Sequence, residues 1–183
     1  MCSGITPRVL TFVIIILTQC NEPWSVLVNT QEMTCIIRDK NFTDFQDCGI
    51  RLDKQKGSVL NLTIKLLQLP VTNCMVHLDI LHLAKSKEPR IVYQGDWEGC
   101  EFLRNRRRFK FLSMIYDPIL TYTNINHTCP YWVGGEHDLH VTNFPAGKIH
   151  APIPIPIGQY KLITQYFVDK ILRHEIWFTF KAS

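Results

Sequence analysis

The sequence contains one place where histidines and an acid lie close enough to suggest a metal site. These are His137, Asp138 and His140. On a strand, however, His137 and His140 point to opposite faces, so they cannot share one ion without a bulge. No CxxC, HExxH or EF-hand spacing occurs elsewhere. We therefore expect solvated polar groups at this place, with no metal and no cofactor.

Catalytic motifs are not recognisable. The sequence has no G-x-S-x-G nucleophile elbow and no phosphate-cradling glycine loop. No catalytic couple stands out among the acids Asp79, Asp96, Glu98 and Glu101. We expect that the protein is not an enzyme, and a secreted hydrolase or its activator is the alternative.

A run of basic side chains allows three interpretations. The run comprises Arg104, Arg106, Arg107, Arg108 and Lys110. These side chains could contact an anionic headgroup or a glycan, or a secretory convertase could cleave after Arg104-Asn105-Arg106-Arg107. A solvated helix face opposite Phe102 and Phe109 is the simpler interpretation, because charge runs on amphipathic helices are usually solvated.

The first twenty residues predict secretion. Arg8 precedes the apolar run 9–17, and Thr18-Gln19-Cys20 offers small residues for cleavage, which is the pattern of a signal peptide. The apolar run is about half of the roughly 20 residues that a membrane-spanning helix needs. We expect a signal peptide at residues 1–20 and a secreted, extracellular protein. An uncleaved interfacial anchor is the alternative.

The rest of the chain has the composition of one folded domain. Residues 21–183 are enough for a single β-sandwich domain and too few for two. The formal charge falls from +4 to +3 when Arg8 is lost, so no nucleic-acid partner is expected. Apolar residues at 46% and charged residues at 20% are typical of a globular domain.

Five cysteines remain after the signal peptide: Cys35, Cys48, Cys74, Cys100 and Cys129. A secretory compartment should pair most of them, but an odd number leaves at least one thiol over. Cys74 is the expected free thiol, because on a strand it shares an apolar face with Val76 and Leu78 and would be a small buried hydrophobe. A bridge between two chains is the alternative for Cys74.

Three glycosylation sequons support the secretory interpretation. They begin at Asn41, Asn61 and Asn126. Each is an acceptor only if it faces solvent. Asn61 is the best placed of the three, because the alternation described next turns it outward.

Alternating apolar residues dominate after residue 57. Leu60, Leu62, Ile64 and Leu66 share one face of a strand, while Asn61 lies on the other. Together with strands at 71–83 and 90–94, this segment predicts an antiparallel meander. Further strands are expected at 138–144, 158–169 and 174–181, and weaker ones at 26–38 and 49–54.

One helix is expected between Cys100 and Tyr122, where apolar residues recur at helical spacing until Pro118 ends or kinks the helix. About eight short strands and one inserted helix predict a mostly β, two-sheet sandwich. The segment 152–157 alternates proline with Ile153, Ile155 and Ile157, so it must be an edge or a loop. Its isoleucines could rim a pocket, touch a membrane or close the sandwich.

Several segments resemble a known family. They are Phe102-Leu103 after Cys100, the stretch 113–120, and above all Asn126-His127-Thr128-Cys129-Pro130-Tyr131, with 66–70 and 156–160 fitting the same pattern. The chain is in these respects similar to a large insect family of secreted proteins of uncharacterised role, related to the chemosensory protein B group. The resemblance covers roughly 34–181.

The resemblance implies an Ig-like β-sandwich of the ML lipid-recognition type, in which a hydrophobic ligand lies between the sheets. It also implies two disulfides, Cys35 with Cys48 and Cys100 with Cys129. Cys74 departs from the four-cysteine pattern of that family. A chemosensory role rests on the resemblance alone.

We therefore expect a secreted, glycosylated protein that binds a small hydrophobic ligand, such as a lipid, a fatty acid derivative or a cuticular hydrocarbon, and that meets a receptor. An extracellular protein-binding sandwich with a solid core is the alternative. The side chains expected to line the ligand cavity are Leu60, Leu62, Ile64, Leu66, Val76, Leu78, Ile80, Tyr160, Leu162, Tyr166, Ile176, Phe178 and Phe180.

Overall fold

The computed structural model describes residues 26–183 except positions 69, 86, 132–137, 148 and 152–154. The expected signal peptide therefore lies outside the described residues. The strands are β1 (Val26–Ile37), β2 (Thr43–Asp53), β3 (Gly57–Leu66), β4 (Met75–His82), β5 (Arg90–Glu98), β6 (Leu139–Pro145), β7 (Ile149–Ala151), β8 (Gly158–Val168) and β9 (Ile171–Ala182). Between β5 and β6 lie α2 (Gly99–Arg104), the 3₁₀ turn η1 (Arg106–Arg108), α3 (Lys110–Tyr116) and the 3₁₀ helix η2 (Asp117–Tyr122).

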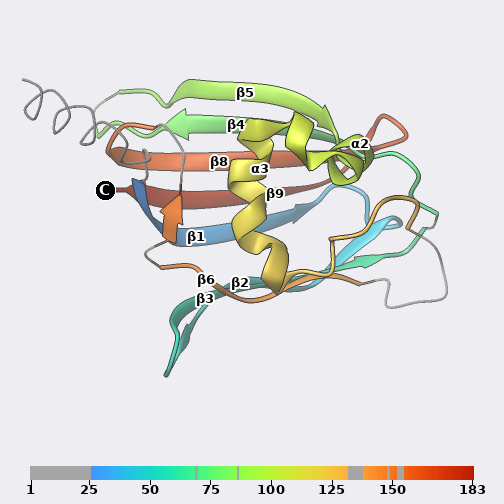
Figure 1. The fold of residues 1–183 in the computed structure, drawn as a ribbon, viewed down its shortest axis with the longest axis horizontal. Helices are drawn as coiled ribbons and strands as arrows, with labels where there is room; N and C mark the ends of the chain where they lie inside the picture. The colour runs from blue at the N-terminus through green and yellow to red at the C-terminus, as the bar shows by residue number, and fades with distance from the viewer. Residues whose placement is uncertain (1–25, 69, 86, 132–137, 148, 152–154) are drawn as a thin grey trace, which may run out of the picture.

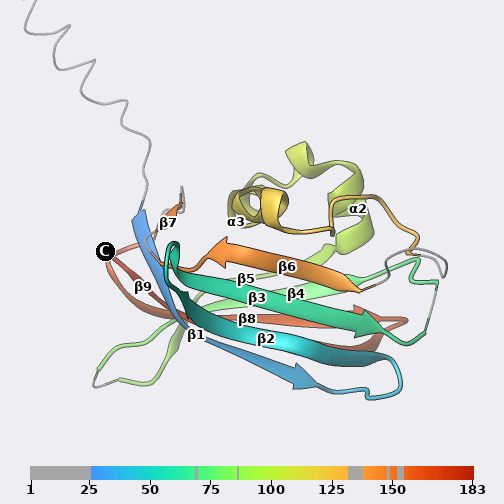
Figure 2. The ribbon, with the colours of Figure 1, turned by 90° about the horizontal axis from the view of Figure 1, so that it is seen from below.

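The strands form two antiparallel sheets (Figures 1 and 2). The larger sheet has the order β5-β4-β8-β9-β1-β7, and the smaller one has the order β2-β3-β6. Both the smaller sheet and the helices lie on the same side of the six-stranded sheet (Figure 2). The prediction of a mostly β, Ig-like two-sheet sandwich is confirmed.

Register across β8 and β9 defines the inner face of the six-stranded sheet. Tyr160 pairs with Phe180, and Leu162 pairs with Phe178. Because paired residues in a sheet point to the same side, every second residue of both strands faces inward. The next rows along the same face pair Thr164 with Ile176 and Tyr166 with His174.

The alternation in β3 is confirmed, but the predicted meander is wrong. Leu60, Leu62 and Ile64 are buried as expected. Their strand, however, pairs with β2 and β6, whereas β4 and β5 pair with each other in the larger sheet. Both sheets present an apolar inner face, so the alternation fixes which side of a strand is buried and does not identify the neighbouring strand.

The single predicted helix is replaced by short helical pieces. Asn105 and Phe109 leave helical geometry, with φ/ψ of −143/66° and −110/65°. These breaks let Phe102 in α2 stay buried and pack edge-on against Phe109 and Tyr116, with ring centroids 6.0 and 5.2 Å apart. Pro118 stands at the start of η2, directly after α3 ends, as the sequence predicted.

Both implied disulfides are present. Cys35 on β1 is joined to Cys48 on β2, which links the two sheets. Cys100 in α2 is joined to Cys129, which ties the start of the helical segment to the loop that follows it. Cys74 is the free cysteine among the residues that the structure describes. The disulfides indicate that the chain folds in an oxidising environment.

Replacing both Cys35 and Cys48 by alanine should lower the free energy of unfolding by about 3 kcal/mol, because the bridge closes a loop of 13 residues in the unfolded chain. Urea unfolding without reductant measures the change. Cys74→Ala, which removes a sulfur atom and no bridge, is the control and should cost clearly less. A double variant as stable as the native chain would contradict the prediction.

Candidate functional site

The inner face of the six-stranded sheet is covered by two different parts of the chain. The smaller sheet covers it beside β1 and β9, and α3 crosses it in front of β8 and β9 (Figure 1). The sandwich cluster consists of Phe42, Leu60, Leu62, Ile64, Leu66, Val71, Val141, Phe144, Ala146, Val168 and Ile176. The helix cluster consists of Leu78, Ile80, Tyr160, Phe180 and Ala182, with Phe111, Leu112 and Ile115 of α3 packed against it.

The predicted cavity residues divide between these clusters. Five are buried in the sandwich cluster: Leu60, Leu62, Ile64, Leu66 and Ile176. Four are buried in the helix cluster: Leu78, Ile80, Tyr160 and Phe180. The last four are only partly buried, and these are Val76, Leu162, Tyr166 and Phe178. The structure thus brings all of them to inner faces, while their contact with a ligand stays a prediction.

The two clusters meet where Leu162 and Phe178 pair across β8 and β9. Leu162 packs against the helix cluster, and Phe178 packs against the sandwich cluster. Neither side chain is fully covered, although their neighbours Ile80 and Ile176 are 2% exposed. Apolar surface therefore remains accessible at the junction of the two clusters.

An aromatic edge, which sequence reasoning missed, lies between β5 and α3. Tyr93 stacks on Phe111 with centroids 3.9 Å apart and lies parallel to Trp97 at 6.1 Å. The Trp97 ring lies over Gly95, where a Cβ atom would come within 2.6 Å of it. The sequence did contain a signal for this edge. Tyr93 and Trp97 lie two residues before and after Gly95, and residues two apart share one face of a strand.

Uncharged polar groups lie at the end of the inner face nearest α2. Burial raises the pKa of the Cys74 thiol to about 12, and it also raises the pKa of Tyr166 and Tyr131. The neighbouring Cys74 also contributes to raising the pKa of both tyrosines. These groups are neutral at physiological pH, so the Cys74 thiol is a poor nucleophile. The predicted strand position of Cys74 is wrong, because β4 begins at Met75, and Cys74 is only partly buried.

His174 is a buried titratable side chain in the same row of the sheet. It is 5% exposed, its ring stacks on Tyr166 at 4.6 Å, and its Nδ1 lies 3.3 Å from the hydroxyl of Thr43. Among the described residues its Nε2 has no hydrogen-bond partner. Burial lowers the pKa of His174 to about 4, so the ring is neutral at physiological pH.

The outer face of the larger sheet carries a polar network instead. His77 on β4 lies 2.7 Å from Asp96 and 3.3 Å from Asp79. The hydrogen bond with Asp96 raises the pKa of His77, burial opposes the shift, and Asp79 adds to it. Two of the four acids that seemed unremarkable in the sequence, Asp79 and Asp96, thus contact a histidine, whereas Glu98 caps α2 and Glu101 pairs with Arg108.

Glu175 belongs to the same outer face, and it is 3% exposed. Arg38 and Trp177 donate hydrogen bonds to its two carboxylate oxygens at 2.6 and 3.0 Å. Burial favours a higher pKa for Glu175, but the hydrogen bonds from Arg38, Trp177 and Gln165 hold it below its usual value. The ammonium group of Lys161 lies 3.8 Å from the centre of the Trp177 ring.

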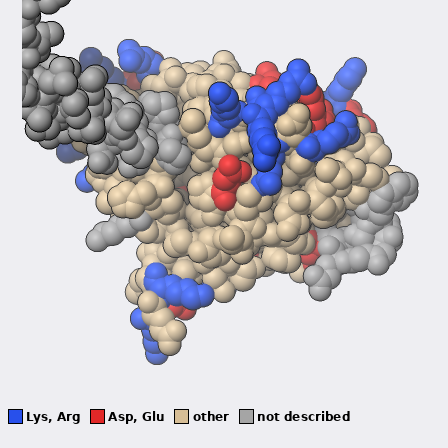
Figure 3. Space-filling view, in the orientation of Figure 1, with Lys and Arg blue, Asp and Glu red and all other residues tan. Residues whose placement is uncertain are grey.

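The basic run does not form the continuous solvated helix face that was expected. It is distributed over the end of α2, η1 and the start of α3, and its side chains gather over the helical segment (Figure 3). Arg108 pairs with Glu101 at 2.7 Å, and Arg106 lies 3.7 Å from Asp117. Among the described residues, Arg104, Arg107 and Lys110 have no ion pair.

The sequons differ in accessibility. Asn41 and Asn126 are exposed. Asn61 lies on the side of β3 away from the core, as expected, but it is only partly exposed and its Oδ1 accepts a hydrogen bond from the backbone of Asn143. Geometry therefore favours Asn41 and Asn126, rather than Asn61, as glycan acceptors.

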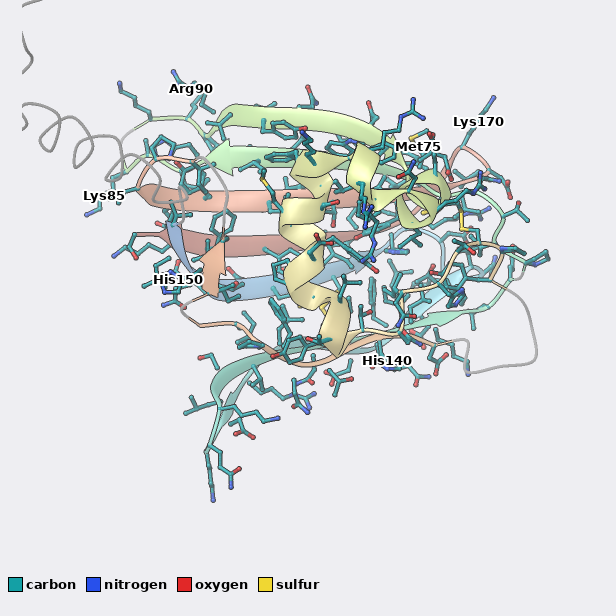
Figure 4. All side chains as sticks on the ribbon, in the orientation of Figure 1. Met75, Lys85, Arg90, His140, His150 and Lys170 are labelled. Carbon is teal, nitrogen blue, oxygen red and sulfur yellow. A yellow bond between two sulfur atoms is a disulfide. The ribbon has the colours of Figure 1, made fainter. Side chains whose placement is uncertain are left out.

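The two ends of the larger sheet are distinct (Figure 4). Lys85 and Arg90 lie at one end, and Met75 and Lys170 lie at the other, near α2. At the end of β8 where Tyr160 lies, Ile155 packs against the helix cluster, whereas Ile157 is 75% exposed. The proline segment thus closes the core through one isoleucine and exposes another, while Ile153 lies outside the described residues.

No metal-binding group of three or more histidine, cysteine or acidic side chains is found in the part of the chain that the structure describes. Of the residues first considered for a metal, His140 lies on β6 and His137 falls outside that part. No helix within the described residues is long and apolar enough to cross a membrane.

The two histidines should give stability opposite dependences on pH. The pKa of His77 is raised above its ordinary 6.5, so its contribution is complete below about pH 6.5 and is lost as pH rises through its folded value. The pKa of His174 is lowered, so its neutral form stabilises the fold above about pH 6.5, and this contribution is lost as pH falls toward 4.

Urea unfolding between about pH 5 and pH 8 separates the two effects. His77→Gln should lose most stability near about pH 5. His174→Phe should make the free energy of unfolding fall less steeply as the pH is lowered. If the free energy of unfolding depends on pH equally in both variants, neither ring has the assigned environment.

The comparison with known proteins gives a match over part of the chain. No curated protein matches it. Residues 76–162 match the model of a family described as "Protein of unknown function (DUF1091)". The matched segment is slightly less than half of the 183 residues, runs from β4 into β8, and includes both helices and the Cys100–Cys129 disulfide. Over this segment the chain is similar to that family.

Proposed function

We propose that this protein is a secreted binding protein that holds a small hydrophobic ligand between its two sheets, in the manner of an ML lipid-recognition domain. The observation that carries the proposal is the incompletely covered inner face at Val76, Leu162, Tyr166 and Phe178. These side chains lie behind the smaller sheet and α3, yet part of their surface remains accessible. An apolar ligand that covers this surface would gain roughly 25 cal/mol for each Å² removed from water.

The helical segment offers a route by which a ligand can enter. α3 is two turns long, and none of its residues is buried. It is held over the sheet by Phe111 on Tyr93 and by the apolar contacts of Leu112 and Ile115. A segment of this kind belongs to the less stable parts of a fold, so it can lift without unfolding the sheets.

The polar groups at the end of the inner face nearest α2 favour a ligand whose polar part is uncharged. Tyr166, Tyr131 and Cys74 are neutral, and His174 is a neutral imidazole. A carboxylate or phosphate placed among them would lose its water without gaining a cation. A neutral lipid, an esterified fatty acid or a hydrocarbon suits this interior better, while the arginines of the helical segment could meet an anionic headgroup outside it.

Mass spectrometry of the protein secreted from eukaryotic cells should detect a copurified or added lipid or hydrocarbon. Native spectra keep a bound ligand, and an organic extract identifies it. The same spectra report the mass of each N-linked glycan. Protein that never carries such a molecule, and takes none up on addition, would instead support the alternative of a protein-binding sandwich.

Leu162→Trp should weaken binding of the fluorescent apolar probe N-phenyl-1-naphthylamine at least about tenfold, because the larger ring fills the accessible surface at the junction. Ile163→Trp is the matched control, since Ile163 is the next residue of β8 and faces outward. Probe fluorescence titration measures both, and thermal unfolding verifies that both fold. Equal affinities in the two variants would contradict the assignment of the inner face.

A further inference from the structure

We infer that the bond between Arg107 and Arg108 is a processing site for an arginine-specific secretory endoprotease, and that the cut leaves a two-chain protein held together by Cys100–Cys129. The sequence around the bond is Arg104-Asn105-Arg106-Arg107-Arg108. It contains the only pair of arginines three residues apart in the chain. Subtilisin-like convertases of the secretory pathway use acidic pockets for an arginine at the cleaved position and for another three residues before it.

Exposure and pairing of the arginines fit this recognition. Arg104 and Arg107 are exposed, and neither has an ion pair among the described residues. Arg106 and Arg108, in contrast, are engaged with Asp117 and Glu101. The two arginines that the protease pockets need are therefore the two whose charges are free for charge-assisted hydrogen bonds.

The local backbone makes the bond accessible at small cost. The 3₁₀ turn η1 is bounded by Asn105 and Phe109, which are both non-helical. Two backbone hydrogen bonds hold the turn, from Arg108 N to Asn105 O and from Phe109 N to Arg106 O. A protease binds its substrate extended, so η1 and the last residue of α2, Arg104, have to open, and the hydrogen bond from Ser113 Oγ to Arg106 O has to break, while α3 is a separate element.

The tertiary structure determines what happens after the cut. Water adds its hydroxyl to the carbonyl carbon of Arg107 and its proton to the nitrogen of Arg108, which gives a new carboxylate and a new amine. Cys100 precedes the cut and Cys129 follows it, so the disulfide spans it. β8 and β9 also lie between β4 and β1, so strands from the two fragments alternate in one sheet.

The cut therefore changes the helical segment and preserves the sheets. α2 keeps the Glu98 cap, whose carboxylate accepts from the backbone of Cys100 and Glu101, and its disulfide. α3 loses its covalent connection to α2 and is held by side-chain contacts and by its continuation into η2.

Incubation of the folded, full-length secreted protein with purified furin tests the inference. On a reducing gel we expect two fragments, with the second beginning Arg108-Phe109-Lys110 by N-terminal sequencing. Without reductant we expect one species whose mass exceeds the intact chain by one water. Arg104→Ala and Arg107→Ala should each slow cleavage at least about tenfold. Lys110→Gln is the matched control and should be cut at the native rate, because Lys110 lies beyond the bond, is exposed and has no ion pair among the described residues.

Several outcomes would overturn the inference. Folded protein that resists furin, while a peptide of residues 101–112 is cut, would show that η1 stays closed. Fragments that separate without reductant, or equal cleavage of Arg104→Ala and the native chain, would also contradict it. An uncut protein that binds phosphatidylserine vesicles through Arg104 and Arg107 would assign this surface to anionic headgroups instead. None of these results depends on whether the protein binds a hydrophobic ligand.

Discussion

A six-stranded sheet with one apolar face needs more cover than a three-stranded sheet can provide. The rest of the architecture follows from this mismatch. The smaller sheet covers the end of β8 and β9 that carries Val168 and Ile176, and the helical segment must cover the other end, which carries Tyr160 and Phe180, together with β4. Because the two covers are different structures, they meet above Leu162 and Phe178, where the inner face retains accessible apolar surface.

Each cover is attached to the larger sheet in its own way. Cys35–Cys48 joins β1 to β2, so the smaller sheet is bound covalently at one edge. The helical segment is joined covalently at its base by Cys100–Cys129, α3 packs through Phe111, Leu112 and Ile115, and η2 packs against the smaller sheet through Ile119 and Tyr122. We propose that this second cover opens for the ligand and presents the bond between Arg107 and Arg108 to a protease.

The two faces of the larger sheet also separate its titratable groups. Inward positions hold groups that burial keeps neutral, such as Tyr166 and His174. Outward positions hold charged groups in hydrogen-bonded sets, such as His77 with its two aspartates. Strand alternation puts Val76 and His77 of β4 on opposite sides although they are adjacent in the chain. An uncharged interior and a charged exterior follow from one periodicity.

Local patterns in the sequence predicted much of this protein. Alternation in 60–66, 158–169 and 174–181 determined which side chains of β3, β8 and β9 face inward, because a strand has a period of two whatever its partners are. It did not predict that Arg173 and Glu175 of β9 are buried as well. The resemblance implied the disulfide pairs. Only the tertiary structure decided that β3 and β4 belong to different sheets, that the helix breaks at Asn105 and Phe109, and that Trp97 lies over Gly95. Strand partners, helix breaks and the side chains left partly covered result from contacts between residues far apart in the chain, and one-dimensional periodicity contains no information about them.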